Sequence, residues 1–364
     1  MLERDSSTPP TSSSGSVGMT NVYMNKPIIV SGIKPTGNLH VGNYLGAIKN
    51  WVELQNSGKY QMYIFIADLH SLTGNLNAKE RHEQILKTSA ELIASGIDPD
   101  KTTLFVQSHI SEHTELAWIF NCVTPVSELE RMTQFKDQSK QQSKNVNTGL
   151  FTYPVLQAAD ILLYGGQVVP VGQDQIQHVE LTRDVARWFN SRFAKATPDK
   201  KYFPETKHLL TEIPKVMSLL DPEKKMSKSL GEGHVIELAD EPNVIEKKLK
   251  KAVTASVGGK GAPGVQNLLL LLKQFSAQGG SASGGEEIYK KFEKAEKDGS
   301  IRYGDLKSEV GEAIAGYFSE FRAKRNELMM NHDELAEILI AGAEKARPVA
   351  EKTMEDVRRL VGIR

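Results

Sequence analysis

Two short segments of the chain carry residue types that bind phosphate. The first is His40-Val41-Gly42-Asn43, which follows an apolar, β-branched run and opens a helical pattern. At a strand-to-helix turn, backbone N–H groups and the positive end of the helix dipole converge, and both attract anions. Gly42 lacks the Cβ that would keep a nucleobase or ribose away, and His40 and Asn43 supply donors. Lys34-Pro35-Thr36-Gly37 just upstream adds a rigid turn with a charge and a hydroxyl.

The second segment is Lys225-Met226-Ser227-Lys228-Ser229, far behind the first in the chain. A basic pentapeptide is commonly a solvated surface loop, but this one combines ammonium groups with hydroxyls, and Gly231 and Gly233 follow as hinges. Donors aimed at charge that develops in a transition state accelerate a reaction. We therefore expect Lys225 and Lys228 to hold a departing pyrophosphate, and the two segments to close on one nucleoside triphosphate.

Composition limits the remaining classes of function. The 364 residues include 45 basic and 45 acidic ones, so contact with nucleic acid requires a local patch. The single cysteine, Cys122, excludes an intrachain disulfide, and its apolar neighbours predict a buried thiol. No apolar run is long enough to cross a bilayer, so we expect no membrane partner.

Strand-like and helix-like runs alternate in the first half of the chain. Strands are predicted at residues 27–31, 62–67, 103–107 and 168–171, and helices at residues 41–55, 80–94, 112–122 and 153–164. This rhythm is typical of an α/β fold with a doubly wound, parallel Rossmann-type sheet, which binds ligands at the carboxyl ends of its strands. His40, Asp68 and Gln107 are expected to gather there, and Asp174 to cap the helix that follows it.

Strand signals end at about Glu241. Helices are predicted at residues 243–253, 266–275, 303–327 and 333–361, the last broken or kinked near Pro348, with a Gly/Ser loop at residues 279–285. The sequence therefore predicts an all-helical C-terminal region.

The complete motifs resemble those of class I aminoacyl-tRNA synthetases, in which residues 40–43 and 225–229 match the two class motifs (HIGH and KMSKS) in the expected order. From residue 27 to residue 364 the chain resembles, more specifically, the tryptophanyl-tRNA synthetases of bacterial and mitochondrial type. The further strings that carry this resemblance are residues 32–37, 67–70, 129–136, 158–164 and 171–175.

The resemblance implies a reaction in two steps. L-Tryptophan attacks the α-phosphate of ATP to form tryptophanyl-adenylate, and the adenylate then esterifies the 3′ end of tRNA(Trp). The substrates supply the nucleophiles, so the protein contributes positioning and electrostatics. Mg²⁺ is expected to travel with ATP, held mainly by phosphates and water, because the sequence shows no carboxylate cluster for a metal site of its own.

Site residues are carried over position by position. The resemblance assigns catalysis to His40, Asn43, Lys225, Ser227 and Lys228. It assigns ATP binding to Lys34, Pro35, Thr36, Gly42, Asn43, Gly172, Gln173, Asp174, Val216, Lys225, Met226, Ser227, Lys228 and Ser229. It assigns tryptophan binding to His70, Tyr153, Gln157, Asp160 and Gln175, with Asp160 accepting the indole N–H.

Three residues depart from the family pattern. Lys34 stands where the family usually has Gln, and Gln173 where it usually has Glu, so the ATP site is expected to be more cationic than usual. Gln157 stands where bacterial members often have Met, which suggests the mitochondrial branch. The mitochondrial matrix is therefore the predicted compartment, with the cytoplasm as the alternative, although the Ser-rich start of the chain carries Glu3 and Asp5 and fits a presequence poorly.

The resemblance also implies a division into domains. A disordered tail is expected at residues 1–26, a Rossmann catalytic domain at residues 27–220 with a helical insertion near residues 112–165, a mobile loop at residues 221–233 and a tRNA anticodon-binding helical domain at residues 234–364. The family forms homodimers, for which residues 118–132 are an interface candidate. The basic residues expected to meet tRNA phosphates are Lys247, Lys248, Lys250, Lys251, Arg322, Lys324 and Arg325.

Two other functions stay open at this point. A tyrosyl-tRNA synthetase shares the fold and the chemistry, and residues 158–164 together with residues 225–229 favour tryptophan over it. A non-catalytic RNA-binding protein with a synthetase-like shell is the alternative from another class. The joint presence of His40, Gly42, Asn43 and Lys228 argues against it, because such a protein has no physical need for phosphate donors.

Overall fold

The computed structural model describes residues 26–133, 135, 146–194, 201–210, 215–254, 261–276 and 282–363, without the side chains of residues 174 and 282–284. The predicted tail of residues 1–26 lies, apart from Lys26, outside the described residues. So do most of the polar stretch that follows residue 133 and the first part of the predicted loop at residues 279–285.

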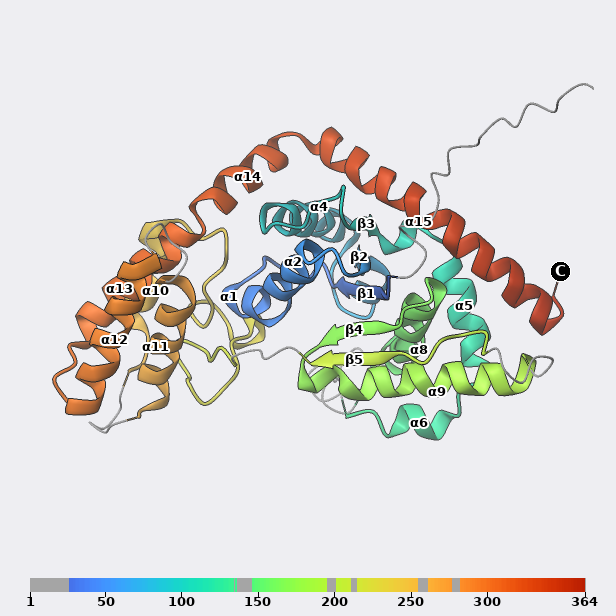
Figure 1. Ribbon diagram of the computed structural model, residues 1–364, viewed down its shortest axis with the longest axis horizontal. Coiled ribbons are helices and arrows are strands. Elements are labelled where there is room, and N and C mark those ends of the chain that lie inside the picture. Colours follow the sequence, from blue (N-terminus) through green and yellow to red (C-terminus); the bar gives the residue numbers. More distant parts are fainter. Residues whose placement is uncertain are drawn as a thin grey trace, which may run out of the picture.

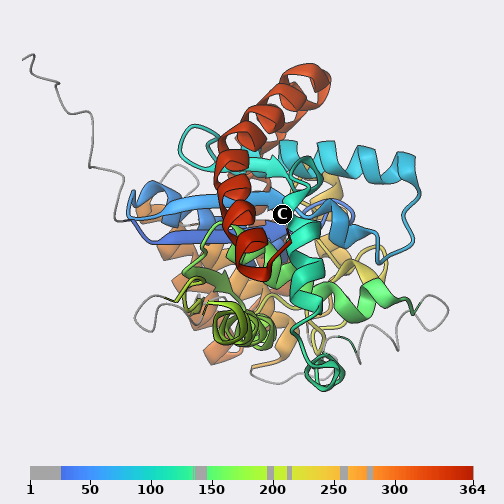
Figure 2. The same cartoon turned by 90° about the vertical axis from the view of Figure 1, so that its right-hand side faces the viewer.

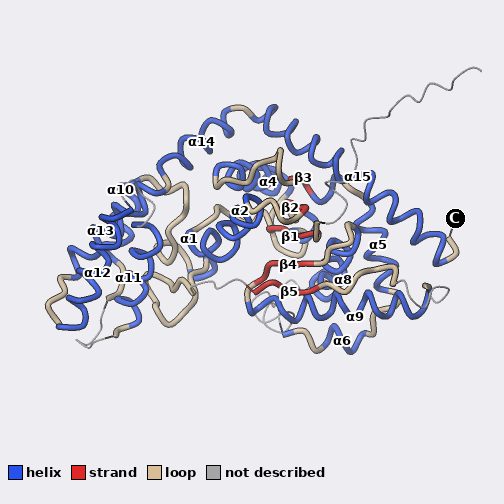
Figure 3. The backbone as a smooth tube through the Cα atoms, viewed as in Figure 1, coloured by secondary structure: helices blue, strands red, loops and turns tan. Residues whose placement is uncertain are grey.

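A parallel sheet at the centre of the molecule organises the fold (Figure 1, Figure 3). In the described residues its strands follow the order β3-β2-β1-β4-β5, and each pair is parallel. The winding reverses between β1 and β4, which places the topological switch point at the carboxyl ends of these two strands. The doubly wound α/β fold is therefore confirmed. The strands are β1 (Ile28–Ile33), β2 (Gln61–Ile66), β3 (Thr103–Val106), β4 (Val168–Val171) and β5 (Lys207–Leu210).

Helices cover both faces of the sheet and extend beyond it. The first group is α1 (Val41–Asn43), the π-helical η1 (Tyr44–Ile48), α2 (Lys49–Asn56), α3 (Asp68–Ser71), α4 (Ala78–Ala94), α5 (Glu112–Asn121), α6 (Val126–Glu130), α8 (Thr148–Leu163) and α9 (Ile176–Phe193). The second is α10 (Pro242–Lys251), α11 (Pro263–Ser276), α12 (Ala282–Asp298), α13 (Tyr303–Tyr317), α14 (Ser319–Met330) and α15 (His332–Val361). No helix among these is long and apolar enough to span a membrane.

Strand β2 shows why its sequence is continuously apolar. Met62, Ile64 and Ile66 pack into the cluster beneath α1, η1 and α4, whereas Tyr63 and Phe65 pack into the cluster beneath α5, α8 and α9. Successive side chains of a strand point to opposite faces, and here both faces are buried. The four predicted strands are confirmed. Strand β5 was not predicted because its polar residues Lys207 and His208 interrupt the apolar pattern.

The predicted C-terminal helical region comprises two parts in the structure. Helices α10, α11, α12 and α13 pack against one another as a bundle, whereas α14 packs on α4 and α15 packs across β3 and α5 (Figure 1, Figure 2). The single helix predicted at residues 303–327 is divided at Phe318, because this ring is buried among aromatic side chains between α13 and α14. Helix α12, which begins inside the predicted Gly/Ser loop, was not predicted.

Helix α15 crosses the sheet through a stripe of small residues. A Cβ on Gly342 would lie 1.8 Å from the carbonyl oxygen of Leu104 in β3, and Ala343, Ala346 and Ala350 are buried beside it. The predicted break near Pro348 is wrong, because α15 runs through this residue without interruption. Packing along both halves of the helix compensates for the hydrogen bond that proline removes.

Cys122 corrects a further expectation. The thiol predicted to be buried is exposed, because Cys122 caps the C-terminal end of α5 beyond its last buried turn. Leu116 and Phe120 fill the core from the other face of the same helix.

We predict opposite effects for the same substitution at two helical glycines. Gly342→Ala should destabilise the protein by about 1–3 kcal/mol, because the added methyl group meets backbone that cannot move aside. Gly316→Ala in α13 adds a methyl group in open space and should stabilise the protein by about 0.5–1 kcal/mol, because alanine favours the helix. Urea unfolding followed by circular dichroism measures both. A Gly342→Ala midpoint at or above that of the wild type would contradict the packing described here.

Candidate active site

The two predicted phosphate-binding segments meet around one cavity of about 290 Å³. The Nζ atom of Lys228 lies 3.5 Å from the carbonyl oxygen of Thr36 and donates to it, which joins the second segment to the loop before the first. The residues that line the cavity are Ile33, Lys34, Thr36, Gly37, Leu39, His40, Asn43, Ser227, Lys228 and Ser229.

Backbone pairing holds the first segment against the chain that follows the second. Val41 N donates to Ile236 O at 2.9 Å, and Leu238 N donates to Leu39 O at 2.9 Å. At the start of α1, the backbone N–H of His40 donates to Asn43 Oδ1 at 3.1 Å, so Asn43 caps the helix with the oxygen of its side chain. These bonds fix the strand-to-helix turn whose N–H groups were predicted to face phosphate.

A π-helical turn follows α1 directly. Residues Tyr44–Ile48 form the five-residue element η1, and α2 then continues the helix. The sequence pattern predicted one regular helix over residues 41–55, because periodicity does not distinguish a single wide turn from an α-helical one. Such insertions are frequent at functional sites, and this one begins directly after Asn43, which lines the cavity.

Two glycines make room for side chains of the site. A Cβ on Gly42 would lie 2.9 Å from His40 Cε1, so the absence of a side chain leaves room for the imidazole ring of His40. The sequence predicted that Gly42 leaves room for a nucleobase or ribose. A Cβ on Gly37 would lie 3.0 Å from Lys228 Nζ, and the φ angle of Gly37 is +79°, which favours glycine.

The cavity is cationic, and its histidine is uncharged at neutral pH. Burial lowers the pKa of His40 to about 4, and the charges of Lys228 and Lys225 act in the same direction. Burial also lowers the pKa of Lys228, while Glu237 and Glu91 oppose that shift. His40 can therefore donate or accept a hydrogen bond without adding charge, and the lysines supply the positive field for an anion.

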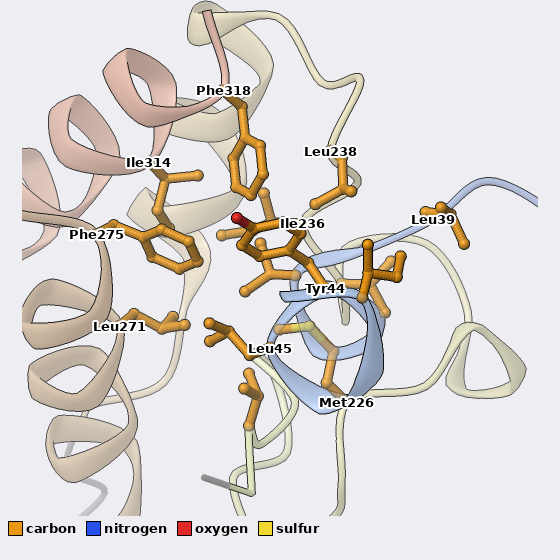
Figure 4. Packing of buried hydrophobic residues seen from close by; sticks show 14 of the residues in the cluster. Leu39, Tyr44, Leu45, Met226, Ile236, Leu238, Leu271, Phe275, Ile314 and Phe318 are labelled. Carbon is orange, nitrogen blue, oxygen red and sulfur yellow. The ribbon is translucent and has the colours of Figure 1, made fainter. Parts of the chain in front are cut away.

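The remaining residues of the second segment differ in placement. Lys225 is exposed and forms an isolated β-bridge with Met217. Met226 was predicted to bind ATP, but its side chain is buried in the hydrophobic cluster behind the cavity, beside Leu45 and Ile236 (Figure 4). Val216 is buried as well and accepts a hydrogen bond from Met226 N at 2.9 Å. These two residues therefore support the segment with their side chains.

A second polar cluster surrounds Asp160 in α8, whose side chain is 1% exposed. His113 Nδ1 and Gln107 Nε2 donate to its Oδ1 atom at 2.6 and 2.7 Å, and His70 Nε2 donates to Oδ2 at 2.7 Å. Burial raises the pKa of Asp160, but the hydrogen bonds and charges of His113 and His70 outweigh it and hold the pKa at about 2. The carboxylate is therefore ionised and fixed in orientation.

The cluster continues beyond His113. Because the carboxylate has no proton, His113 donates to it through Nδ1, and its Nε2 atom forms a hydrogen bond with the hydroxyl of Tyr164 at 2.8 Å. Neither His113 nor Tyr164 was predicted as part of the site. Tyr164 ends residues 158–164, which carry the family resemblance, but no pattern in the sequence marks His113, which reaches Asp160 from another helix.

The two polar clusters are connected. Lys34 Nζ donates to Thr73 Oγ1 at 3.2 Å, Thr73 Oγ1 donates to His70 O at 2.9 Å, and His70 contacts Asp160. Asp68 Oδ1 accepts from the backbone of Ser108, so the turns after β2 and β3 are joined as well. The predicted gathering of residues at the carboxyl ends of the strands is therefore confirmed, with Gln107 reaching Asp160 and His40 reaching the cavity.

The other predicted site residues lie around these clusters. The ring of Tyr153 packs edge-on to His70, with the centroids 6.3 Å apart, and its hydroxyl bonds to His178 Nε2 at 2.9 Å. Gln157 is half-buried on α8, beside the turn that carries Asp160. Pro35 is buried, Gly172 and Gln175 are half-buried and Gln173 is exposed, the last three at the carboxyl end of β4 next to β1. The side chain of Asp174 lies outside the described residues.

Several basic residues expected to meet tRNA instead support the fold. Arg322 is 9% exposed and donates to Ala315 O, and Arg325 pairs with the buried Glu91. Lys248 is bound to Asp240. Their guanidinium and ammonium groups are held inside the protein because buried carboxylates and carbonyls need donors. The exposed members of the set are Lys247, Lys250, Lys251 and Lys324.

Within the described part of the chain, no group of three or more His, Cys, Asp or Glu side chains is placed to hold a metal ion. The cavity offers ammonium groups, hydroxyls and N–H donors, which suit phosphate oxygens and not a divalent cation. A magnesium ion at this site therefore depends on oxygens that a ligand brings.

We predict that His40 remains neutral in the folded protein down to about pH 4. In the unfolded chain His40 takes up a proton near its usual pKa of 6.5. Its contribution to the free energy of unfolding is therefore fully present above pH 6.5 and is lost as the pH drops from 6.5 toward 4. Lys228→Met should raise the pKa of His40 only part of the way back toward 6.5, because burial lowers this pKa more than the charge of Lys228 does. An NMR titration of the imidazole signals measures this, with Lys224→Met as the control that leaves the value unchanged. A wild-type pKa near 6.5 would contradict the electrostatics described above.

Comparison with known proteins agrees with this geometry. The family model of class I tRNA synthetases for tryptophan and tyrosine (W and Y) matches residues 24–319. The tryptophan–tRNA ligase of Clostridium perfringens is 42% identical over 344 residues, which cover 93% of this chain and 98% of that protein. The corresponding ligase of Corynebacterium efficiens is 43% identical, over 92% and 94% of the two chains.

A solved structure extends the comparison to the fold. Tryptophanyl-tRNA synthetase from Campylobacter jejuni, complexed with ADP and tryptophan, superposes with a TM-score of 0.77. The two chains are 34% identical, and the match covers 92% of this chain and all of the other. The chain therefore belongs to the class I tRNA synthetases of the tryptophan and tyrosine type.

Proposed function

We propose that the chain is a tryptophan–tRNA ligase, which activates L-tryptophan with ATP and transfers it to tRNA(Trp). The observation that carries the proposal is the single cavity formed by the His40 segment and the Lys228 segment. It presents a helix N-terminus on one side and a lysine ammonium on the other, as a triphosphate requires.

The first step follows from this arrangement. The carboxylate of tryptophan attacks the α-phosphorus, a new carboxylate–phosphorus bond forms, and the bond to pyrophosphate breaks. Charge accumulates on the departing pyrophosphate, where Lys228 stabilises it, and Lys225 approaches from the exposed side of the same segment. His40 and Asn43 hold the phosphates at the start of α1. The protein forms no covalent intermediate, so its contribution is orientation and charge.

Magnesium enters this mechanism with its substrate. The described residues around the cavity are donors to phosphate, so Mg²⁺ would be held by ATP oxygens and water. There it would neutralise phosphate charge, and the lysines of the second segment would hold the oxygens that it leaves free.

The Asp160 cluster suits an indole. An ionised carboxylate only accepts hydrogen bonds, and the indole nitrogen only donates them. Oδ1 of Asp160 accepts from two partners, whereas among the described residues Oδ2 accepts from His70 alone. Since each carboxylate oxygen can accept two bonds, Oδ2 retains one for the substrate. A site built in this way rejects side chains without a donor, because they leave the carboxylate unpaired.

Transfer to tRNA, dimer formation and compartment belong to the same proposal. Trp118 and Val126 are 70% and 61% exposed on neighbouring helices, which supports part of residues 118–132 as a homodimer surface, while Leu129 and Met132 belong to the core. Exposed lysines of α10 are available to tRNA phosphates. Localisation in the mitochondrial matrix, or alternatively the cytoplasm, stays a prediction.

We expect Lys228→Met to slow tryptophan-dependent pyrophosphate exchange by roughly two orders of magnitude while the thermal midpoint changes little, because the lysine acts on charge that develops in the reaction. Lys224→Met, a neighbouring lysine paired with Asp221 outside the cavity, is the matched control. An unchanged rate in Lys228→Met would remove this residue from the mechanism. A wild-type protein that exchanges with none of the twenty amino acids would support the non-catalytic alternative.

We expect Asp160→Asn to lower kcat/KM for tryptophan about 10- to 100-fold, because a hydrogen bond to a charged acceptor is lost. Exchange with tyrosine and phenylalanine tests specificity in the same assay. Asp184→Asn, at a half-buried aspartate of α9 paired with Arg187, is the control and should have no effect. Exchange that prefers tyrosine to tryptophan in the wild type would favour the tyrosyl-tRNA synthetase alternative.

A further inference from the structure

Glu91 is a buried carboxylate outside both polar clusters. The side chain of Glu91 in α4 is fully buried, and the proposed reaction does not use it. Burial of an ionised carboxylate is unfavourable unless hydrogen bonds and an opposite charge compensate it. Glu91 has both kinds of partner, and they come from distant parts of the chain.

The two oxygens of Glu91 face different functional regions. Oε2 accepts from the backbone N–H of Leu39 at 2.7 Å. Leu39 lines the triphosphate cavity and directly precedes His40. Oε1 accepts from Arg325 Nε at 3.0 Å, and Arg325 belongs to α14, which follows the C-terminal bundle. One carboxylate therefore connects the ATP loop to the C-terminal helices.

The same loop is held on its other side by the segment behind Lys228. Leu238 N donates to Leu39 O at 2.9 Å, and Asn38 Nδ2 donates to Glu237 Oε2 at 2.8 Å. The backbone before His40 is thus clamped between Glu91 and residues 237–238. A shift of Glu91 would turn the Leu39 peptide and with it the wall of the cavity.

The start of α14 also contacts Tyr44, the residue that follows α1. The ring of Phe318 packs edge-on to Tyr44, with the centroids 5.0 Å apart (Figure 4). The hydroxyls of Tyr44 and Tyr317 lie 2.6 Å apart. Tyr44 directly follows Asn43. The end of the bundle and α14 therefore reach both flanks of the His40 segment, Tyr44 through aromatic contacts and Leu39 through the Arg325–Glu91 pair.

We infer that Glu91 and Arg325 are positioning residues that couple the placement of the C-terminal helices to ATP binding. Arg325 opposes the rise in the pKa of Glu91 that burial causes and holds this side chain in place, and Glu91 in turn holds the Leu39 backbone against the triphosphate cavity. A macromolecule bound to the C-terminal helices that moved α14 would change the affinity for ATP, and ATP would change the affinity for that macromolecule by the same factor. The inference rests on the proposed ATP site and not on which amino acid is activated.

The test measures both substrates in pyrophosphate exchange. Arg325→Met and Glu91→Met should each raise the KM for ATP about tenfold and leave the KM for the amino acid within about twofold. The double variant should resemble a single variant, because both substitutions break one connection. It also removes both charges, so no buried charge is left unpaired if a single variant folds poorly. Arg325→Lys should restore part of the ATP affinity.

Arg359→Met is the matched control, since this exposed arginine of α15 pairs with Asp356 on the same helix and should leave both KM values unchanged. Equal increases in the two KM values, or effects of the two single variants that add in the double variant, would overturn the coupling. So would variants that lower only the thermal midpoint. A wild-type protein without any exchange activity would instead refute the proposed function, so the two failures are distinguishable.

Discussion

The pairing of two backbone segments determines most of what this molecule can do. Residues 39–41 bond to residues 236–238, and this contact brings the Lys228 segment against the start of α1. Without it, a helix N-terminus and a basic loop would be two weak anion sites far apart in the sequence. With it they form one cavity, in which the positive charges act on the same ligand.

The buried carboxylates show how the fold makes polar groups specific. Asp160 receives three side-chain hydrogen bonds, and Glu91 receives one from the backbone and one from an arginine. Asp160 is ionised, and the pairing of Glu91 with Arg325 opposes the rise in its pKa that burial causes. In the proposed reaction Asp160 is a fixed acceptor for the substrate, whereas Glu91 holds the wall of the neighbouring cavity.

Helices α14 and α15 pack directly on the sheet and on the helices around the candidate site. Helix α15 lies on β3 through a glycine that leaves no space for a methyl group, and α14 reaches Glu91 through Arg325. An aromatic cluster around Tyr44 joins the bundle to the catalytic helix (Figure 4). A region expected to bind RNA is therefore in direct contact with the elements proposed to hold ATP, which provides a physical path for communication between the two steps of the reaction.

The sequence alone determined the parallel sheet and the family, and it singled out the two segments predicted to bind phosphate, because buried strands and short motifs are local patterns. It also identified Asp160, through resemblance. Only the tertiary structure decided that Met226 faces the core and that α15 continues through Pro348. Likewise, His113 and Glu91 became functional candidates only through their partners in space. His113 lies 47 residues from Asp160 in the chain, and Glu91 lies 234 residues from Arg325. Such contacts depend on packing between distant elements, and periodicity along the chain contains no information about them.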